Sequence, residues 1–410
     1  MTQASLAARM QFMIEIARRL HQYGTSAPRL EDAIDSVSAR LLLNCHSLST
    51  PTSILFSFSD RARGDDALAE VTQVIRVSPG QDDLRSLSAV NEIADCVVDG
   101  KLDIEEGYRR LRALRDRPGR FRATLETLAY GLASAAVAAL LKTGWADVLA
   151  AGVLGFGVGL LSLLCERRPR LRASLEAISA LLVTLLASVI SVYVASLSLK
   201  SVVLASVIVL LPGLTLTTAV RELSTQHLVS GVARFAGAMT TLIKLAFGTV
   251  VATQLCQWLR LTPPALAVTP IPVWAQWVAL LFGGFSFAVL FRAARRDVPL
   301  VMASAALGYA ITYYGGQAFT PAFGVFLAGF GMGALSNLYA AATRRPGALV
   351  RLPGIILLVP GSIGFQSLSL IAQRDVFLGI DTAVTLIAIL VSLVAGLLFG
   401  DLFASSRRIL

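Results

Sequence analysis

Long apolar runs, separated by short polar segments, fill the chain from about residue 121 to its end. Each run is close to the roughly 20 residues that a helix needs to cross a bilayer. Ten runs can be read, at residues 124–141, 147–165, 174–195, 201–220, 229–256, 274–291, 297–313, 318–341, 352–371 and 377–403. This pattern predicts a polytopic α-helical membrane protein with ten transmembrane helices.

The first 120 residues follow a different pattern. Apolar residues recur at helical spacing in four segments and at strand spacing in two. The expected elements are helices over residues 6–20, 28–41, 83–98 and 104–115, and strands over 53–59 and 70–77 joined by a charged turn at 60–66. We therefore expect an N-terminal α/β domain over residues 1–120. No secretory signal opens the sequence, so this domain is expected in the cytoplasm.

The distribution of charge agrees with this division. Residues 1–120 hold 16 basic and 17 acidic residues, whereas the remaining 290 hold 20 basic and 9 acidic ones. Charged residues make up 15% of the chain, against roughly 25% in soluble domains. This composition excludes a soluble enzyme spanning the whole chain. The late basic residues lie between apolar runs, which argues against a solvated face that binds nucleic acid.

The basic residues between the runs also predict the topology, because cytoplasmic loops are enriched in Lys and Arg. With the N-terminal domain inside, fifteen basic residues fall on the cytoplasmic side and four on the other. The cytoplasmic set is Arg122, Arg167, Arg168, Arg170, Arg172, Arg221, Arg234, Arg292, Arg295, Arg296, Arg344, Arg345, Arg351, Arg407 and Arg408. The opposite set is Lys142, Lys200, Arg260 and Arg374. Both termini are therefore expected in the cytoplasm.

The residues that commonly perform catalysis or bind metals form no such pattern. The four cysteines and three histidines are scattered, without metal-ligand spacing or the arrangement of a catalytic triad. We expect no metal, no cofactor and no catalytic residue. The arginine-rich segment 109–122 precedes the first apolar run and is expected to contact anionic lipid headgroups.

Two apolar runs carry a matched Pro-Gly pair at their middle. Pro212-Gly213 and Pro360-Gly361 each follow four aliphatic residues and lie 148 residues apart, close to five runs. Because five is odd, two such modules would enter the membrane from opposite sides, as inverted repeats do in secondary transporters. We expect modules over residues 121–262 and 263–410. The alternative is that each Pro-Gly only kinks a packed helix.

A break at mid-membrane frees backbone groups, which a polar cavity or protein must satisfy. The half-helix after each break would present its N-terminus, which favours an anion or the carboxylate of a zwitterion. Lys244 lies well inside a run, where charge is costly and usually faces the interior or a cavity. It could bind a substrate carboxylate or pair with a neighbouring polar group, and the alternative is that its side chain reaches the membrane surface. The predicted substrate-binding residues are Pro212, Gly213, Thr215, Thr217, Thr218, Lys244, Pro360, Gly361, Ser362, Gln366 and Ser367.

Charged residues near the expected cytoplasmic ends of runs four and five form a second candidate group. Arg221, Glu222 and Arg234 could form a gate or a coupling ion pair, or they could anchor the topology. No carboxylate lies at the centre of a run, so the sequence identifies no proton carrier.

Several segments, in the same order, resemble the bacterial threonine/serine exporter family in its fused form. They are Gly24–Glu31, Thr50–Ile54, Pro212–Gly213 with Ala219–Leu223 and Ser230–Arg234, and Leu352–Gly354 with Val359–Ser362. Gly24, Arg29 and Glu31 match a motif of the family's cytoplasmic domain, and ordinary surface salt bridging is the alternative for this pair of charges. Glu222 stands where aspartate is usual in the family. The resemblance implies proton-driven export of small amino acids or organic acids.

We therefore expect a secondary active transporter of the bacterial inner membrane, not an enzyme, exporting threonine or serine by alternating access at broken helices four and nine. Its partners would be a small carboxylate-bearing substrate, a proton or another coupling ion, and lipid. A succinate-like dicarboxylate is the alternative substrate. A membrane-anchored enzyme or sensor and a channel are the alternative classes. The oligomeric state, a homo-oligomer included, stays open.

Overall fold

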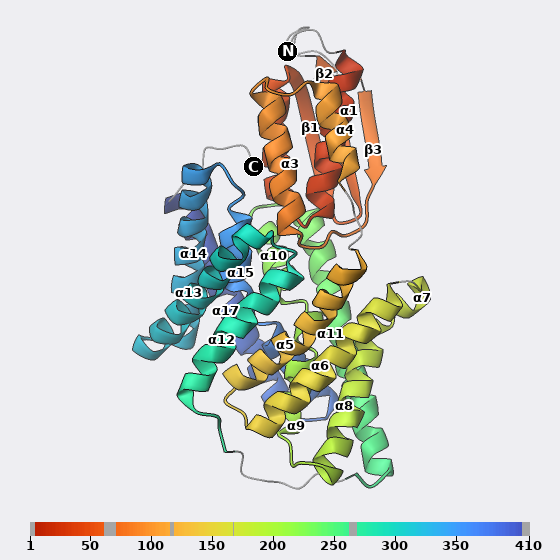
Figure 1. Ribbon diagram of the computed structural model, residues 1–410, viewed down its shortest axis with the longest axis vertical. Coiled ribbons are helices and arrows are strands. Elements are labelled where there is room, and N and C mark those ends of the chain that lie inside the picture. Colours follow the sequence, from red (N-terminus) through yellow and green to blue (C-terminus); the bar gives the residue numbers. More distant parts are fainter. Residues whose placement is uncertain (1–4, 61–70, 115–118, 167, 262–268, 404–410) are drawn as a thin grey trace.

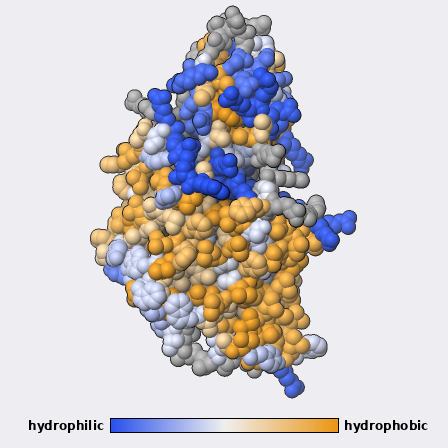
Figure 2. Space-filling view, viewed as in Figure 1, coloured by the Kyte–Doolittle hydropathy of each residue, from blue (hydrophilic) through white to orange (hydrophobic). Residues whose placement is uncertain are grey.

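The computed structural model describes residues 5–60, 71–114, 119–166, 168–261 and 269–403. A small α/β unit lies on one end of an elongated bundle of helices (Figure 1). Apolar residues cover most of the visible surface of the bundle, whereas hydrophilic residues gather on the α/β unit (Figure 2). The two parts therefore face different surroundings, lipid for the bundle and water for the α/β unit.

The α/β unit contains a three-stranded antiparallel sheet in the order β1-β2-β3 with four helices. Its elements are α1 (Leu6–Gln22), α2 (Ala27–Arg40), β1 (Leu43–Thr50), β2 (Ser53–Asp60), β3 (Val71–Arg76), α3 (Leu84–Val98) and α4 (Ile104–Ala113). The large side chains at its centre, Phe12, Met13, Phe56 and Phe58, are fully buried. The expected turn at 60–66 lies almost wholly outside the described residues.

One strand of this sheet was not expected from the sequence. Strand β1 pairs along its whole length with β2, from Leu43 opposite Asp60 to Thr50 opposite Ser53. Half of its eight residues are serine, threonine or histidine, and its sequence lacks a clean alternation. Pairing with the apolar strand β2 therefore stabilises an extended segment that shows little preference of its own.

Nine helices in the described ranges are long and apolar enough to cross a membrane, or up to ten if a bent pair forms one span. The uninterrupted ones are α5 (Arg120–Leu140), α6 (Trp145–Cys165), α8 (Leu175–Tyr193), α11 (Leu228–Trp258), α12 (Val273–Leu290), α13 (Val298–Ala318), α14 (Pro321–Thr343) and α17 (Val376–Phe403). A single turn, α7 (Pro169–Arg172), precedes α8. The chain is a multi-pass membrane protein with a small sheet near its N-terminus.

Two helices are interrupted at the Pro-Gly pairs. The first runs as α9 (Leu199–Ser206), a 3-10 turn η2 (Ile208–Leu210) and α10 (Gly213–Ser224). A bend of 54° separates α9 from the segment that begins at Ile208. The second runs as α15 (Ala348–Ile356) and α16 (Gly361–Ala372). Proline removes a backbone donor, so the helical hydrogen bonding stops at the break and restarts after it. The helix breaks expected from the sequence are therefore present.

Basic residues end several of the membrane helices. A lysine or arginine with positive φ follows α5, α11, α12, α14 and α16 by one or two residues; these are Lys142, Arg260, Arg292, Arg344 and Arg374. The left-handed residue terminates the helix, and the positive charge interacts favourably with its C-terminal dipole. Five of the basic residues counted for the topology thus also terminate helices.

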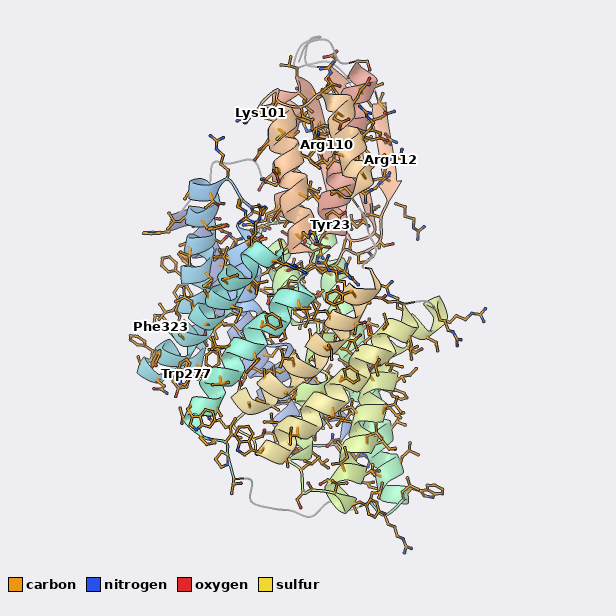
Figure 3. All side chains as sticks on the ribbon, in the orientation of Figure 1. Tyr23, Lys101, Arg110, Arg112, Trp277 and Phe323 are labelled. Atoms are coloured by element: carbon orange, nitrogen blue, oxygen red, sulfur yellow. The ribbon has the colours of Figure 1, made fainter. Side chains whose placement is uncertain are left out.

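An aromatic cluster lies toward the ends of α12 and α13 that point away from the α/β unit. The Trp277 ring is 6.4 Å from Tyr309 and 6.5 Å from Tyr313, centroid to centroid. Figure 3 shows Trp277 at this end, whereas Lys101, Arg110 and Arg112 lie on the α/β unit. Tryptophan and tyrosine favour the interface between hydrocarbon and headgroups. This cluster indicates where the bundle leaves the membrane.

Candidate functional site

The two interrupted helices meet at their glycines. A Cβ atom on Gly361 would lie 2.9 Å from Gly213 Cα and 3.0 Å from Gly213 N. A Cβ atom on Gly213 would lie 3.3 Å from Gly361 N and would overlap Val359 Cγ1. The two backbones are therefore in direct contact, although 148 residues separate them in the sequence. Only glycine fits without displacement at this crossing.

The two half-helices that leave the crossing begin alike. Pro212 stands directly before α10 and Pro360 directly before α16, and neither end has a side-chain cap among the described residues. The first full helical bonds run from Leu216 N to Pro212 O and from Gly364 N to Pro360 O. Each start therefore leaves amide groups without helical partners, and these carry partial positive charge.

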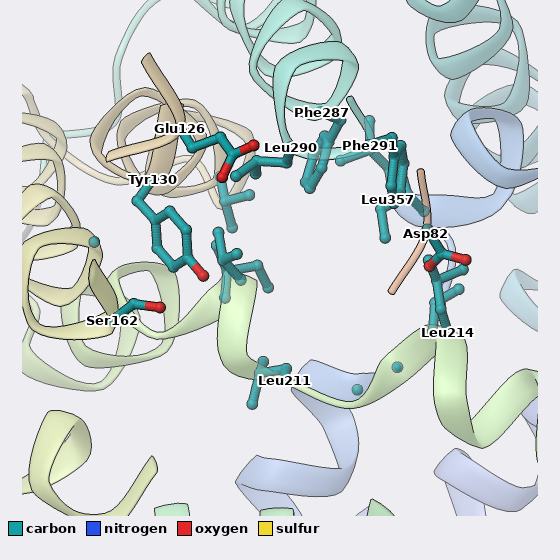
Figure 4. Close-up of a pocket in the computed structure, with 18 of the residues that line it drawn as sticks. Asp82, Glu126, Tyr130, Ser162, Leu211, Leu214, Phe287, Leu290, Phe291 and Leu357 are labelled. Carbon is teal, nitrogen blue, oxygen red and sulfur yellow. The ribbon is translucent and has the colours of Figure 1, made fainter. Parts of the chain in front are cut away.

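A cavity of 520 Å³ lies beside the crossing, and Figure 4 shows part of its lining. Helices α5, α6, α12 and α13, both helix breaks and the loop before α3 line it. Four of the predicted residues border it, namely Gly213, Thr215, Gly361 and Ser362. Two glycines from corresponding places in the two interrupted helices, and a hydroxyl group within two residues of each glycine, thus border one chamber.

The cavity wall is polar toward the α/β unit and apolar toward the other end of α5. Glu126, Tyr130 and Ser162 contribute polar groups, and Arg292 Nε donates a hydrogen bond of 2.9 Å to Glu126 Oε1. Further along α5 the lining consists of Val137, Leu140 and Leu141. Because Arg292 neutralises Glu126, this pair adds polarity without a net charge.

A wider cavity of 1270 Å³ lies between the α/β unit and the bundle. The two cavities share part of their lining, which consists of Gln81, Ala123, Tyr130, Ser162, Leu163, Glu166 and Arg292. They are therefore contiguous, and the chamber at the crossing is reached from the side on which the α/β unit lies.

The other predicted substrate-binding residues do not line the chamber. Thr217 Oγ1 donates to Gly213 O at 3.2 Å, and Ser367 Oγ donates to Gly379 O at 2.8 Å, so both hydroxyls bond the helix backbone. Lys244 Nζ donates to Ala173 O at 2.8 Å and lies 3.5 Å from Glu176 Oε2, near the start of α8. The remaining predicted residues outside the lining are Pro212, Thr218, Pro360 and Gln366.

The far end of α10 binds the α/β unit through Glu222, whose side chain is fully buried. Its carboxylate accepts hydrogen bonds from Ala27 N at 3.0 Å, Ser230 Oγ at 2.9 Å and Arg234 Nε at 3.0 Å. Ala27 is the first residue of α2. The half-helix that starts at the crossing therefore ends on the N-terminus of a helix in the α/β unit.

The motif residues Glu31 and Arg29 lie at the same junction. Glu31 Oε1 accepts from Ser49 N at 2.7 Å, and its Oε2 lies 3.3 Å from His227 Nε2, just before α11. Burial lowers the pKa of Arg29 to about 10, and neighbouring Arg221 adds to the effect. The motif therefore serves the contact between the two parts of the protein, not a solvated helix surface.

A cluster that the sequence did not reveal surrounds Asp401 in α17. Arg221 Nη2 lies 2.6 Å from Asp401 Oδ2, Arg351 pairs with the same carboxylate, and Asn337 Nδ2 donates to it at 3.0 Å. Arg351 is buried in α15 instead of lying in a loop as its topology role suggested. The signal in the sequence was Asp401 itself, a carboxylate near the end of an apolar run, because such residues usually have a charged partner.

No group of three or more His, Cys, Asp or Glu side chains in the described ranges is arranged to hold a metal ion. The chamber holds polar and charged side chains next to an apolar wall. Such an arrangement suits a small zwitterionic or anionic molecule better than a purely apolar one.

Comparisons with known proteins point to one family. Residues 11–256 match the threonine/serine exporter family, and residues 276–403 match a second family of threonine/serine exporters, ThrE. No solved structure shows a significant match.

Among curated proteins, the chain is similar to several from fungi. It is 25% identical over 344 residues to pheromone-regulated membrane protein 10 of Eremothecium gossypii, covering 82% of this chain and 46% of that protein. The protein of the same name in Saccharomyces cerevisiae is also 25% identical over 344 residues, with 82% and 44% covered. An uncharacterised Schizosaccharomyces pombe protein is 27% identical over 348 residues, with 82% and 41% covered. The chain thus spans less than half the length of these relatives.

Proposed function

Because the chain belongs to the threonine/serine exporter family, we propose that it is a secondary active transporter that exports threonine and serine. The observation that carries this proposal is the chamber at the contact of the two interrupted helices, where Gly213 and Gly361 touch. Paired broken helices that meet at a polar site are the usual construction of such transporters.

The proposed substrate site uses both helix starts. The carboxylate of the amino acid would accept hydrogen bonds from the free amides at the start of α10 or α16, where the helix dipoles favour negative charge. Thr215 and Ser362 would bond the polar side chain or the carboxylate. A cavity of 520 Å³ holds a small amino acid together with water.

The proposed mechanism is alternating access. We assign the residues before and after about position 262 to two inverted five-helix modules that move against each other around the Gly213–Gly361 contact. The contiguous wide cavity corresponds to a state open toward the α/β unit. That side would be the cytoplasm of a bacterial cell, as the distribution of Lys and Arg favours, and a proton gradient would drive export.

Reconstitution tests this function. Purified protein in liposomes should move labelled threonine and serine saturably and, under an imposed pH gradient, against their concentration gradients. Labelled succinate serves as the competing substrate. Transport of succinate alone would identify a dicarboxylate as the substrate instead of the amino acids. Passive, non-saturable flux would identify a channel. Absence of movement of all three compounds would contradict the proposal.

A further inference from the structure

The loop between β3 and α3 enters the chamber from the α/β unit. Gln81 and Asp82 of this loop line the cavity at the crossing. At the loop's end, Asp83 Oδ1 accepts from Ser86 N at 2.8 Å and so caps α3, while Leu84 N donates to Phe291 O at 2.9 Å. The loop is therefore fixed to the end of α12, next to the chamber.

Two glycines allow the same loop to pack against the turn between α1 and α2. A Cβ atom on Gly80 would overlap His21 O, and Gln81 N donates to Gln22 O at 3.2 Å. Gly24 has a φ of +88°, and a Cβ atom there would lie 2.5 Å from Asp82 Oδ1 and 3.1 Å from Asp82 Cα. Because Gly24 has no side chain, Asp82 fits against it.

The carboxylate of Asp82 has no bonding partner in the described structure. No hydrogen bond or ion pair joins it to another described residue, whereas neighbouring Asp83 lies 3.9 Å from Arg292 Nη1. Figure 4 shows Asp82 at the chamber beside Leu214 and Leu357. Burial raises its pKa to about 6, and Arg234, which opposes this, is already bound to Glu222.

We propose that Asp82 binds the ammonium group of the transported amino acid, so that the N-terminal α/β unit supplies a specificity-determining residue to the transport site. This inference rests on the proposed function. A carboxylate held next to apolar groups without a partner is costly, and a cationic ligand group removes that cost. A dicarboxylate would instead bring two more negative charges to the same chamber.

Binding of two ligands to the full-length protein separates this role from a structural one. The ligands are threonine and 3-hydroxybutanoate, which has a hydrogen in place of the ammonium group. By titration calorimetry, Asp82→Asn should weaken threonine binding by about tenfold, the scale of a charge-assisted hydrogen bond. It should leave 3-hydroxybutanoate binding within about twofold. Asp82→Glu should keep the preference for threonine.

Asp99→Asn, on the exposed end of α3, is the matched control and should bind both ligands as the unaltered protein does. Unchanged threonine affinity in Asp82→Asn would overturn the inference while leaving the transport function intact. Equal losses for both ligands, or an Asp82→Glu protein without preference, would also overturn it, because they indicate that Asp82 only shapes the domain contact. If the unaltered protein neither binds nor transports threonine or serine, both proposals fall.

Discussion

At the scale of single residues, the two glycines of the crossing differ in what surrounds them. Gly361 faces the backbone of Gly213, whereas Gly213 faces mainly the end of the Val359 side chain. A valine side chain can shift by a small rotation, but a helix backbone cannot shift without moving the whole half-helix. The two positions therefore tolerate a methyl group differently.

We expect Gly361→Ala to reduce transport about tenfold or more, equivalent to roughly 1.4 kcal/mol, and Gly213→Ala to reduce it less. The initial rate of threonine uptake into proteoliposomes, at equal protein content, measures both. Gly157→Ala is the control, because a Cβ atom there meets open space. Equal activity of the Gly361 and Gly157 variants would contradict the proposed role of the contact.

The protonation of Asp82 gives a second prediction at this scale. Because its pKa is raised to about 6 by burial, its charge is present above pH 6 and is lost as the pH falls through 6. An exposed aspartate would keep its charge down to about pH 3.9. The other titratable or charged groups near the loop and the two cavities are Arg18, His21, Tyr23, Arg76, Asp83, Glu126, Tyr130, Cys165, Glu166, Arg172, Glu176, Arg234, Arg292 and Tyr309.

Threonine affinity should therefore fall between pH 7 and pH 5 in the unaltered protein and stay flat in Asp82→Asn. Burial lowers the pKa of His21, so that histidine gains its proton only below its usual range. Calorimetric titrations at several pH values provide the measurement. A parallel pH dependence in both proteins would assign the titration to another group.

Which individual residues face the chamber could be predicted only in part. The Pro-Gly signal led to Gly213, Thr215, Gly361 and Ser362, because a helix break exposes the residues next to it. It did not show that Thr217 bonds the preceding turn of its own helix, or that Ser367 bonds Gly379 of the neighbouring α17. Asp82 could not be found, because tertiary packing alone brings its loop to the membrane part.

At the scale of elements, α10 links the crossing to the α/β unit. It starts at Gly213, and buried Glu222 near its other end accepts a hydrogen bond from Ala27 N, the first amide of α2. A helix of this length transmits movement along its axis as a nearly rigid body. In the proposed mechanism, movement of this half-helix would therefore act directly on α2.

We expect Glu222→Gln to destabilise the contact by on the order of 2 kcal/mol, because it weakens charge-assisted hydrogen bonds and leaves Arg234 without a counter-charge. Faster hydrogen exchange at the start of α2 would report this change. Glu106→Gln is the matched control, since Glu106 is likewise paired with arginine, in its case two arginines, but on the exposed surface of α4. Equal exchange in both variants would contradict the assigned role of Glu222.

The membrane helices were largely predictable as elements, whereas β1 was not. Apolar runs of the length of α5 or α12 have few stable alternatives in lipid, because every backbone group must bond within the segment. Strand β1 depends instead on its partner β2, and a partner is a non-local property of the sequence. The inverted relation of the two modules stays a prediction.

At the scale of the whole molecule, the cluster around Asp401 joins both halves of the bundle to the α/β unit. Arg221 belongs to α10, Arg351 to α15 and Asp401 to α17, and Arg29 of α2 is close enough to influence the same carboxylate. Three arginines therefore share one acidic group, and its charge limits their mutual repulsion.

We expect Asp401→Asn to lower the thermal unfolding midpoint and to increase hydrogen exchange in α2. Added salt should restore part of the loss, because it screens repulsion among the arginines. Asp381→Asn, on an exposed position of the same helix, should behave as the unaltered protein. A normal midpoint and normal exchange in the Asp401 variant would show that the cluster adds little to the assembly.

The loop of the α/β unit that borders the chamber has a thermodynamic consequence. Two binding events that share a contact strengthen each other by the same free energy, whichever occurs first. If Asp82 binds the substrate, then the bound substrate in turn stabilises the contact between the α/β unit and the bundle. Without substrate, that contact is weaker. A macromolecule that binds only the α/β unit would thereby change the substrate affinity of a site within the membrane, which it never contacts.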